Sequence, residues 1–178
     1  MTKLAPLLAL LFAASAAADP MPAGRLSVVG GVRSGTGGLA DELGLGYVLG
    51  IEAGYQPMGP LQRLGWGASW STLFSWYGDG SARVADQLAM VEIDLGLRGR
   101  VALGARRRLL LHVGGGGALL RLNEPVVRDG DRNQVGPWAS AGVEFLLVGF
   151  VCGVSLRYGT VLDGSGTIGL QLALGRGT

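Results

Sequence analysis

Eight charged residues stand out because they lie within segments that are otherwise apolar or rich in glycine: Glu52, Arg63, Glu92, Asp94, Arg98, Arg100, Glu144 and Arg157. In each segment the charge falls at the positions that carry small or polar residues, so all eight are expected on one face. Four acids facing four bases can form an ion-pair network, or they can carry protons or ions. The equal numbers favour a structural network, because an unpaired buried charge costs several kcal/mol.

Residues of one strand that share a face are two apart, so Glu92 and Asp94 lie on the same face as Arg98 and Arg100. Their ion-pair partners are therefore expected on neighbouring strands. Candidates for these partners are Glu52, Arg63, Glu144 and Arg157.

Residues suited to nucleophilic or redox chemistry are few. His112 is the single histidine and is followed by Val113-Gly114. Cys152 is the single cysteine and has no base beside it in the sequence, so it is expected to behave as a small apolar residue. We predict a packed histidine on the inward face and no catalytic residue.

Three glycine-rich or acidic segments resemble ligand-binding motifs but lack essential parts. Residues 164–169 match GxGxxG without the strand–turn–helix context of a dinucleotide site, and Gly114 to Gly117 lack the lysine of a phosphate loop. Residues 129–133 lack the spacing and the closing glutamate of a calcium loop. The sequence therefore predicts no cofactor and no metal.

The composition indicates a chain that buries apolar surface. Of 178 residues 33 are glycine, 48% are hydrophobic and 16% are charged, which argues against disorder, and the glycines lack the three-residue period of collagen.

The first eighteen residues predict a secretory signal peptide, with the mature domain at 19–178. The signals are Lys3, the apolar stretch 4–14 and Ala16-Ala17-Ala18. The near-neutral mature chain gives no reason to expect a nucleic-acid partner, and one cysteine excludes an internal disulfide.

Period-2 alternation predicts that the mature chain is all-β. It is clearest in 44–56, 63–76 and 89–101, where one face is apolar and the other is small, polar or charged. Weaker alternation marks further strands at 25–33, 108–122, 135–147, 150–160 and 167–175. The sequence thus predicts eight strands.

The connections between these strands alternate in length. Longer or more polar stretches occupy 34–43, 77–87, 123–134 and 161–166, and short ones occupy 57–61, 102–106 and 147–149. Long loops on one side and short turns on the other are typical of outer-membrane barrels. Aromatic residues are also expected at both interfaces: Tyr47, Trp76, Trp138 and Tyr158 at the outer one, and Tyr55, Trp66, Phe145 and Phe150 at the inner one. Of these, Trp138 falls on the interior parity of its strand and does not fit the pattern, and neither does Trp70 in the middle of its strand.

With these features the chain resembles the small eight-stranded outer-membrane barrels, a group that includes the transmembrane domain of outer-membrane protein A. The resemblance implies an eight-stranded antiparallel up-and-down transmembrane barrel. It also implies a bacterial outer-membrane location, contact with outer-membrane lipid and a monomeric state. A barrel of this size has a bore that its own side chains fill. We therefore expect a non-enzymatic structural or surface-interaction module whose extracellular loops do the binding, with 123–134 as the longest and most charged loop.

Two alternatives remain open at the level of sequence. A soluble periplasmic lipocalin-like barrel would bind a ligand, but it would place Glu52, Glu92 and Asp94 in water and Ile51 and Trp66 in its cavity. An outer-membrane enzyme that modifies lipid A would need a catalytic histidine and serine, and the sequence has no His-x-Ser arrangement.

Overall fold

A computed structural model of the chain describes residues 23–37, 44–56, 65–77, 88–103, 108–122, 133–147, 150–160 and 165–177. Within these ranges it contains eight strands: β1 (Gly24–Thr36), β2 (Gly46–Tyr55), β3 (Trp66–Tyr77), β4 (Leu88–Leu103), β5 (Leu109–Leu122), β6 (Asn133–Leu147), β7 (Phe150–Thr160) and β8 (Gly166–Gly177). The eight predicted strands are confirmed. The predicted signal peptide, Arg63 and almost all of loop 123–134 lie outside the described residues. None of the described segments forms a helix of the length and apolarity needed to cross a membrane.

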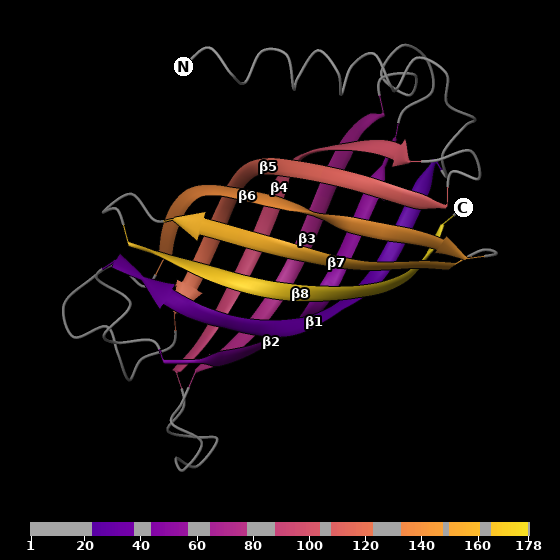
Figure 1. Cartoon of the computed structure of the whole chain (residues 1–178). Helices are drawn as coiled ribbons and strands as arrows, with labels where there is room; N and C mark the ends of the chain where they lie inside the picture. The colour runs from indigo at the N-terminus through magenta and orange to yellow at the C-terminus, as the bar shows by residue number, and fades with distance from the viewer. Residues whose placement is uncertain are drawn as a thin grey trace, which may run out of the picture.

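The strands form one closed antiparallel barrel in chain order (Figure 1). Each strand pairs with the next, and β1 pairs with β8 over twelve residue positions, from Arg25 opposite Gly177 to Thr36 opposite Gly166. Closure leaves no sheet edge, so the backbone N–H and C=O groups bond between neighbouring strands all the way round. The predicted all-β up-and-down architecture is confirmed.

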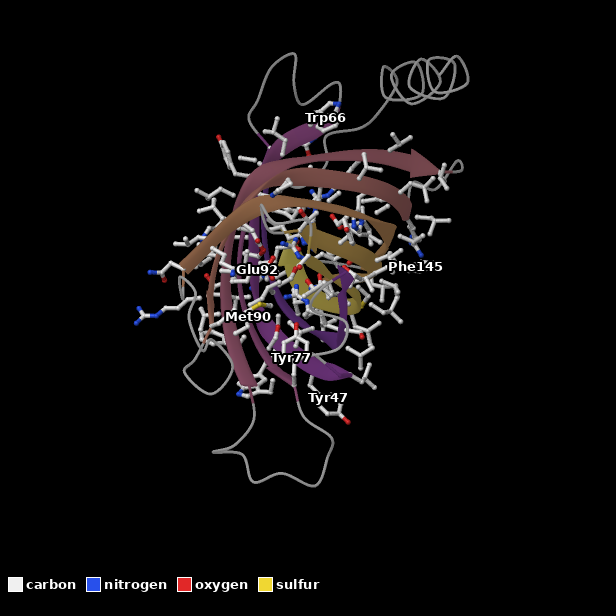
Figure 2. The ribbon with its side chains drawn as sticks, turned by 90° about the vertical axis from the view of Figure 1, so that its left-hand side faces the viewer. Tyr47, Trp66, Tyr77, Met90, Glu92 and Phe145 are labelled. Carbon is white, nitrogen blue, oxygen red and sulfur yellow. The ribbon has the colours of Figure 1, made fainter. Side chains whose placement is uncertain are left out.

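Side chains alternate between the outside and the lumen as the sequence predicted. On β2, Tyr47, Leu49 and Ile51 are exposed, whereas Val48 and Glu52 are buried. On β3 and β4 the same rule holds with the predicted parity. Figure 2 shows Tyr47 and Phe145 on the outside, and Glu92 and Met90 within the barrel. The barrel therefore has an apolar outer surface and a polar lumen.

Aromatic residues lie near both ends of the barrel, but Trp138 is a correction. Tyr47 pairs with Trp76 at the end where β2 begins, and Tyr55 and Trp66 lie at the opposite end. Trp138 was expected at the outer interface although it falls on the interior parity of its strand, and its side chain is buried in the lumen as that parity indicates. Its indole Nε1 donates to the carbonyl oxygen of Gly117 at 3.2 Å, so the ring is held inside by a hydrogen bond as well as by packing.

The lumen also contains apolar residues, arranged at two levels. Toward the end where β4 begins, one cluster of buried side chains packs inside the barrel, formed by Tyr77, Met90, Ala118, Leu120, Leu122 and Trp138. Nearer the middle, Val29, Val48 and Leu73 cover the inner wall of β1, β2 and β3. The charged side chains are confined to the space that these two groups leave.

If the outer surface contacts lipid, an outward arginine should destabilise the barrel according to depth. Leu95 lies in the middle of β4 and Leu103 at its end, and both point outward. We expect Leu95→Arg to lower the free energy of unfolding in bilayers by about 2–4 kcal/mol and Leu103→Arg by about 0–1 kcal/mol, as measured by denaturant titration. Equal effects of the two substitutions would contradict a lipid-facing surface.

Candidate functional site in the barrel interior

All four acidic residues of the described strands point into the lumen: Glu52, Glu92, Asp94 and Glu144. Five arginines share it with them: Arg25, Arg33, Arg98, Arg100 and Arg157. The structure thus places seven of the eight predicted network residues in the interior, and Arg63 lies outside the described residues. Glu92 and Asp94 are almost completely inaccessible to solvent. The charges gather in two clusters, one toward each end of the barrel.

The outer cluster lies at the end where β4 begins and is built around Glu92. Its carboxylate accepts hydrogen bonds from Arg33 of β1 at 2.5 Å and from Arg157 of β7 at 2.6 Å. Arg157 also lies 2.7 Å from the Oδ1 atom of Asp94, whose other oxygen accepts a hydrogen bond from Ser71. Two acids and two bases therefore balance each other here.

The inner cluster lies toward the opposite end and is centred on Glu144 of β6. One carboxylate oxygen is ion-paired with Arg25, and the other lies 3.2 Å from the Nε atom of Arg100. Arg98 approaches at 3.6 Å and the Nδ1 atom of His112 at 3.2 Å. The inward position predicted for His112 is confirmed by its burial.

Glu52 completes the inner cluster. Arg98 contacts both oxygens of its carboxylate, with Nη2 at 2.7 Å from Oε2, and Arg25 donates to Oε1 from 2.5 Å. The planar guanidinium of Arg98 suits this two-point contact. Arg25 and Arg98 each link Glu52 to Glu144, so the inner cluster is one connected network.

Most of these ion pairs cross the lumen, which corrects the expectation of partners on neighbouring strands. Arg33 on β1 pairs with Glu92 on β4, and Arg157 on β7 pairs with the same carboxylate. Adjacent strands contribute fewer pairs, such as Arg25 with Glu52. The physical reason is the narrow bore, because long side chains from opposite walls meet near the barrel axis.

Arg25 and Arg33 were missing from the predicted network. Both lie on β1, where the alternation is weaker because Gly30 and Gly31 interrupt it. The signal was nevertheless present, since Arg25, Ser27, Val29 and Arg33 share one parity and are all buried. The alternation along β1 is therefore enough to place both arginines on the inward face.

Glycines make the room that these side chains occupy. The guanidinium of Arg157 lies 4.4 Å from the centre of the Trp138 ring, an attractive cation–π geometry. A Cβ atom on Gly96 would lie 2.7 Å from that ring and 2.3 Å from the carbonyl oxygen of Gly115, and one on Gly114 would lie 3.3 Å from the ring. The glycine-rich β4–β5 pair is thus the wall against which Trp138 packs.

The arrangement is suited to charge compensation rather than to holding a metal. Among the described residues no group of three or more His, Cys, Asp or Glu side chains could bind a metal ion. Cys152 lies on the outward parity of β7, beside Phe145 and Leu174 in the pairing of the strands.

Removing one buried carboxylate should destabilise the barrel strongly. We expect Glu92→Gln to lower the free energy of unfolding by about 3–5 kcal/mol, because Arg33 then loses the carboxylate with which it is paired and Arg157 keeps only Asp94. Denaturant titration of the refolded barrel measures this effect. Asp129→Asn, a charge removal in the connection between β5 and β6, is the control and should change stability by about 0–1 kcal/mol. Matching midpoints for both variants and the parent would contradict a buried network.

Glycine positions in the Trp138 wall should respond differently to an added methyl group. Gly96→Ala should cost about 1–3 kcal/mol, because its Cβ atom would collide with backbone and with the indole ring. Gly117→Ala, on the same wall but with nothing within 4 Å of the new atom, should be tolerated. Thermal unfolding of the two variants compares them directly. A tolerated Gly96→Ala would show that Trp138 does not pack as described.

No family model matches the sequence, and none of the curated proteins matches it. Several solved structures, however, are similar to this chain. Neisserial surface protein A is similar with a TM-score of 0.64 and 12% sequence identity, covering 90% of this chain and 100% of that chain. The outer membrane enzyme PagL is similar with a TM-score of 0.56 and 13% identity, covering 86% and 99% of the two chains. The N-terminal β-barrel domain of Pseudomonas aeruginosa OprF is similar with a TM-score of 0.51 and 14% identity, covering 87% of this chain and 98% of that chain.

These likenesses extend over nearly the full length of each solved chain at very low sequence identity, so what they share is the fold. The expected resemblance to small outer-membrane barrels is thereby confirmed at the level of architecture: this chain has the closed eight-stranded barrel fold found in these outer-membrane proteins.

Proposed function

We propose that this protein is a bacterial outer-membrane barrel that acts as a structural or surface-interaction module. The observation that carries the proposal is the inverted polarity of the barrel. Every acidic side chain of the described strands lies in the lumen, while the outside presents a continuous set of large apolar residues from all eight strands. An outer surface of this kind is suited to hydrocarbon and unfavourable in water.

The same polarity argues against a soluble ligand-binding barrel. Such a protein would enclose an apolar cavity, but here Leu95, Leu97 and Leu172 are each more than half exposed on the outside. Inside, the ion pairs around Glu92 and Glu144 occupy the space that a ligand would need. These ion pairs make the interior better suited to stabilising the barrel than to binding an apolar ligand.

A non-enzymatic role is favoured by the surroundings of the histidine. His112 lies opposite Gly142, so Ser140 and Glu144 flank it on β6, which brings together the residue types of a hydrolytic triad. However, neither the Oγ atom of Ser140 nor the Nε2 atom of His112 has a hydrogen-bond partner, so the contact between nucleophile and base is not formed. All three side chains are also buried in the lumen. Lipid A modification, the enzymatic alternative, therefore has no support from this group.

Binding is assigned to the loops at the end where β2, β4, β6 and β8 begin. A rigid barrel with a filled lumen offers its loops as the variable surface. Residues 123–132 between β5 and β6 contain Glu124, Arg128, Asp129, Asp131 and Arg132, which makes this connection the most charged one in the sequence. We propose it as the principal contact with an extracellular partner, and outer-membrane lipid as the partner of the barrel wall.

Fractionation of cells that produce the full chain tests this proposal. We expect the protein in the outer membrane, resistant to extraction by urea or carbonate, and monomeric after extraction with a nonionic detergent. Proteases added to intact cells should cut within 123–132 and spare the connections at 57–64 and 104–107. A stable monomer in buffer without detergent would refute the membrane location, and cleavage only at 57–64 or 104–107 would reverse the orientation.

A further inference from the structure

The inner charge cluster contains more positive than negative charge. Three guanidinium groups, those of Arg25, Arg98 and Arg100, face the two carboxylates of Glu52 and Glu144. The outer cluster has two of each. Among the described residues, the inner cluster therefore holds one positive charge without a compensating acid, even with His112 neutral. An uncompensated charge in a site shielded from water is costly, so a counter-ion is favoured.

A small cavity adjoins the uncompensated charge. It lies at the end of the barrel where β2 ends and β3 begins, and its polar lining comes from Gln56, Ser69, Arg98 and Arg100. The cavity has a volume of about 10 Å³, enough for about one water molecule. Gly54 also lines the cavity, and a Cβ atom there would lie 3.6 Å from Nη2 of Arg100, an ordinary van der Waals distance.

Several polar groups that line this cavity have no hydrogen-bond partner. The side chain of Gln56 is buried, with 3% of the residue exposed, yet neither its Nε2 nor its Oε1 atom is bonded. The hydroxyl of Ser69 and the Nε atom of Arg98 are buried and unbonded as well. Buried polar groups are rarely left unsatisfied without an ion or water between them. Three of these groups can donate hydrogen bonds to an anion: the amide of Gln56, the hydroxyl of Ser69 and the guanidinium of Arg98.

The nearby connections do not supply the missing acid. Residues 57–64, 104–107 and 148–149 join strands at this end, and they contain three arginines and no aspartate or glutamate. These three connections therefore bring no acidic side chain to this end of the barrel. A bound cation is disfavoured for the same reason.

We propose that this cavity binds one small monovalent anion, of which chloride is the representative, between Arg98, Arg100, Gln56 and Ser69. The ion accepts hydrogen bonds from the guanidinium, amide and hydroxyl groups and balances the extra positive charge of the inner cluster. The size of the cavity selects a monatomic ion over phosphate or a carboxylate. The site is independent of the loop function proposed above, because it lies inside the opposite end of the barrel.

Chloride-35 NMR of the full chain in a nonionic detergent tests this site. The folded parent should broaden the chloride signal in excess of detergent alone, and bromide should compete whereas sulfate should not. Ser69→Ala should weaken binding about tenfold, as expected for loss of one hydrogen bond to a charged group. Ser75→Ala is the matched control, because Ser75 is a buried serine of the same strand that contacts Arg33 in the outer cluster, and it should leave binding unchanged.

Arg100→Gln separates the anion site from general folding effects. This change leaves two arginines facing two glutamates, so the barrel should fold, and chloride broadening should disappear. The parent should also unfold at a higher temperature in sodium chloride than in sodium gluconate of equal ionic strength, because a ligand that binds only the folded state stabilises it. The variant should lose that difference. Equal broadening by parent and Arg100→Gln, or no broadening by the parent, would overturn the proposal and leave water as the occupant.

Discussion

Closure of the sheet is the constraint on which the rest of this structure depends. An open sheet leaves a row of unpaired backbone N–H and C=O groups along each edge, and only closure pairs every strand on both sides. Here the pairing of β1 with β8 completes the ring. With eight strands the ring is narrow, and side chains from opposite walls must share the space near its axis. The composition of the lumen follows from that narrowness.

The charged groups occupy the lumen because the alternation of the strands admits them on no other face. Each of the three inward glutamates meets guanidinium groups from two strands, as Glu144 does with Arg25 and Arg100. Such pairs offset the cost of burying each charge and tie together walls that share no backbone hydrogen bonds. Glycines at Gly96 and Gly114 provide the opposing space for Trp138, whose ring in turn lies over Arg157. The contacts that pair the buried charges are therefore also the contacts that stabilise the barrel.

The likeness to other barrels at 12–14% identity has a simple physical explanation. A closed eight-stranded barrel requires strands of adequate length, an alternation of inward and outward side chains and a filled inside, and many sequences satisfy these conditions. The fold consequently places few demands on any individual residue. In this chain the lumen holds two separate ion-pair clusters with an apolar layer at one end.

The sequence by itself determined the strands, their inward and outward faces and the membership of most of the interior network, because period-2 alternation is a local property of the chain. Glu52, Glu92 and Glu144 could be assigned to the lumen from their neighbours alone. The tertiary structure decided which charges meet. The contact of Arg33 with Glu92 across the bore, the inward packing of Trp138 and the excess positive charge beside Gln56 depend on closure and register. These relations join residues far apart in the chain, and no local pattern encodes the distance between them.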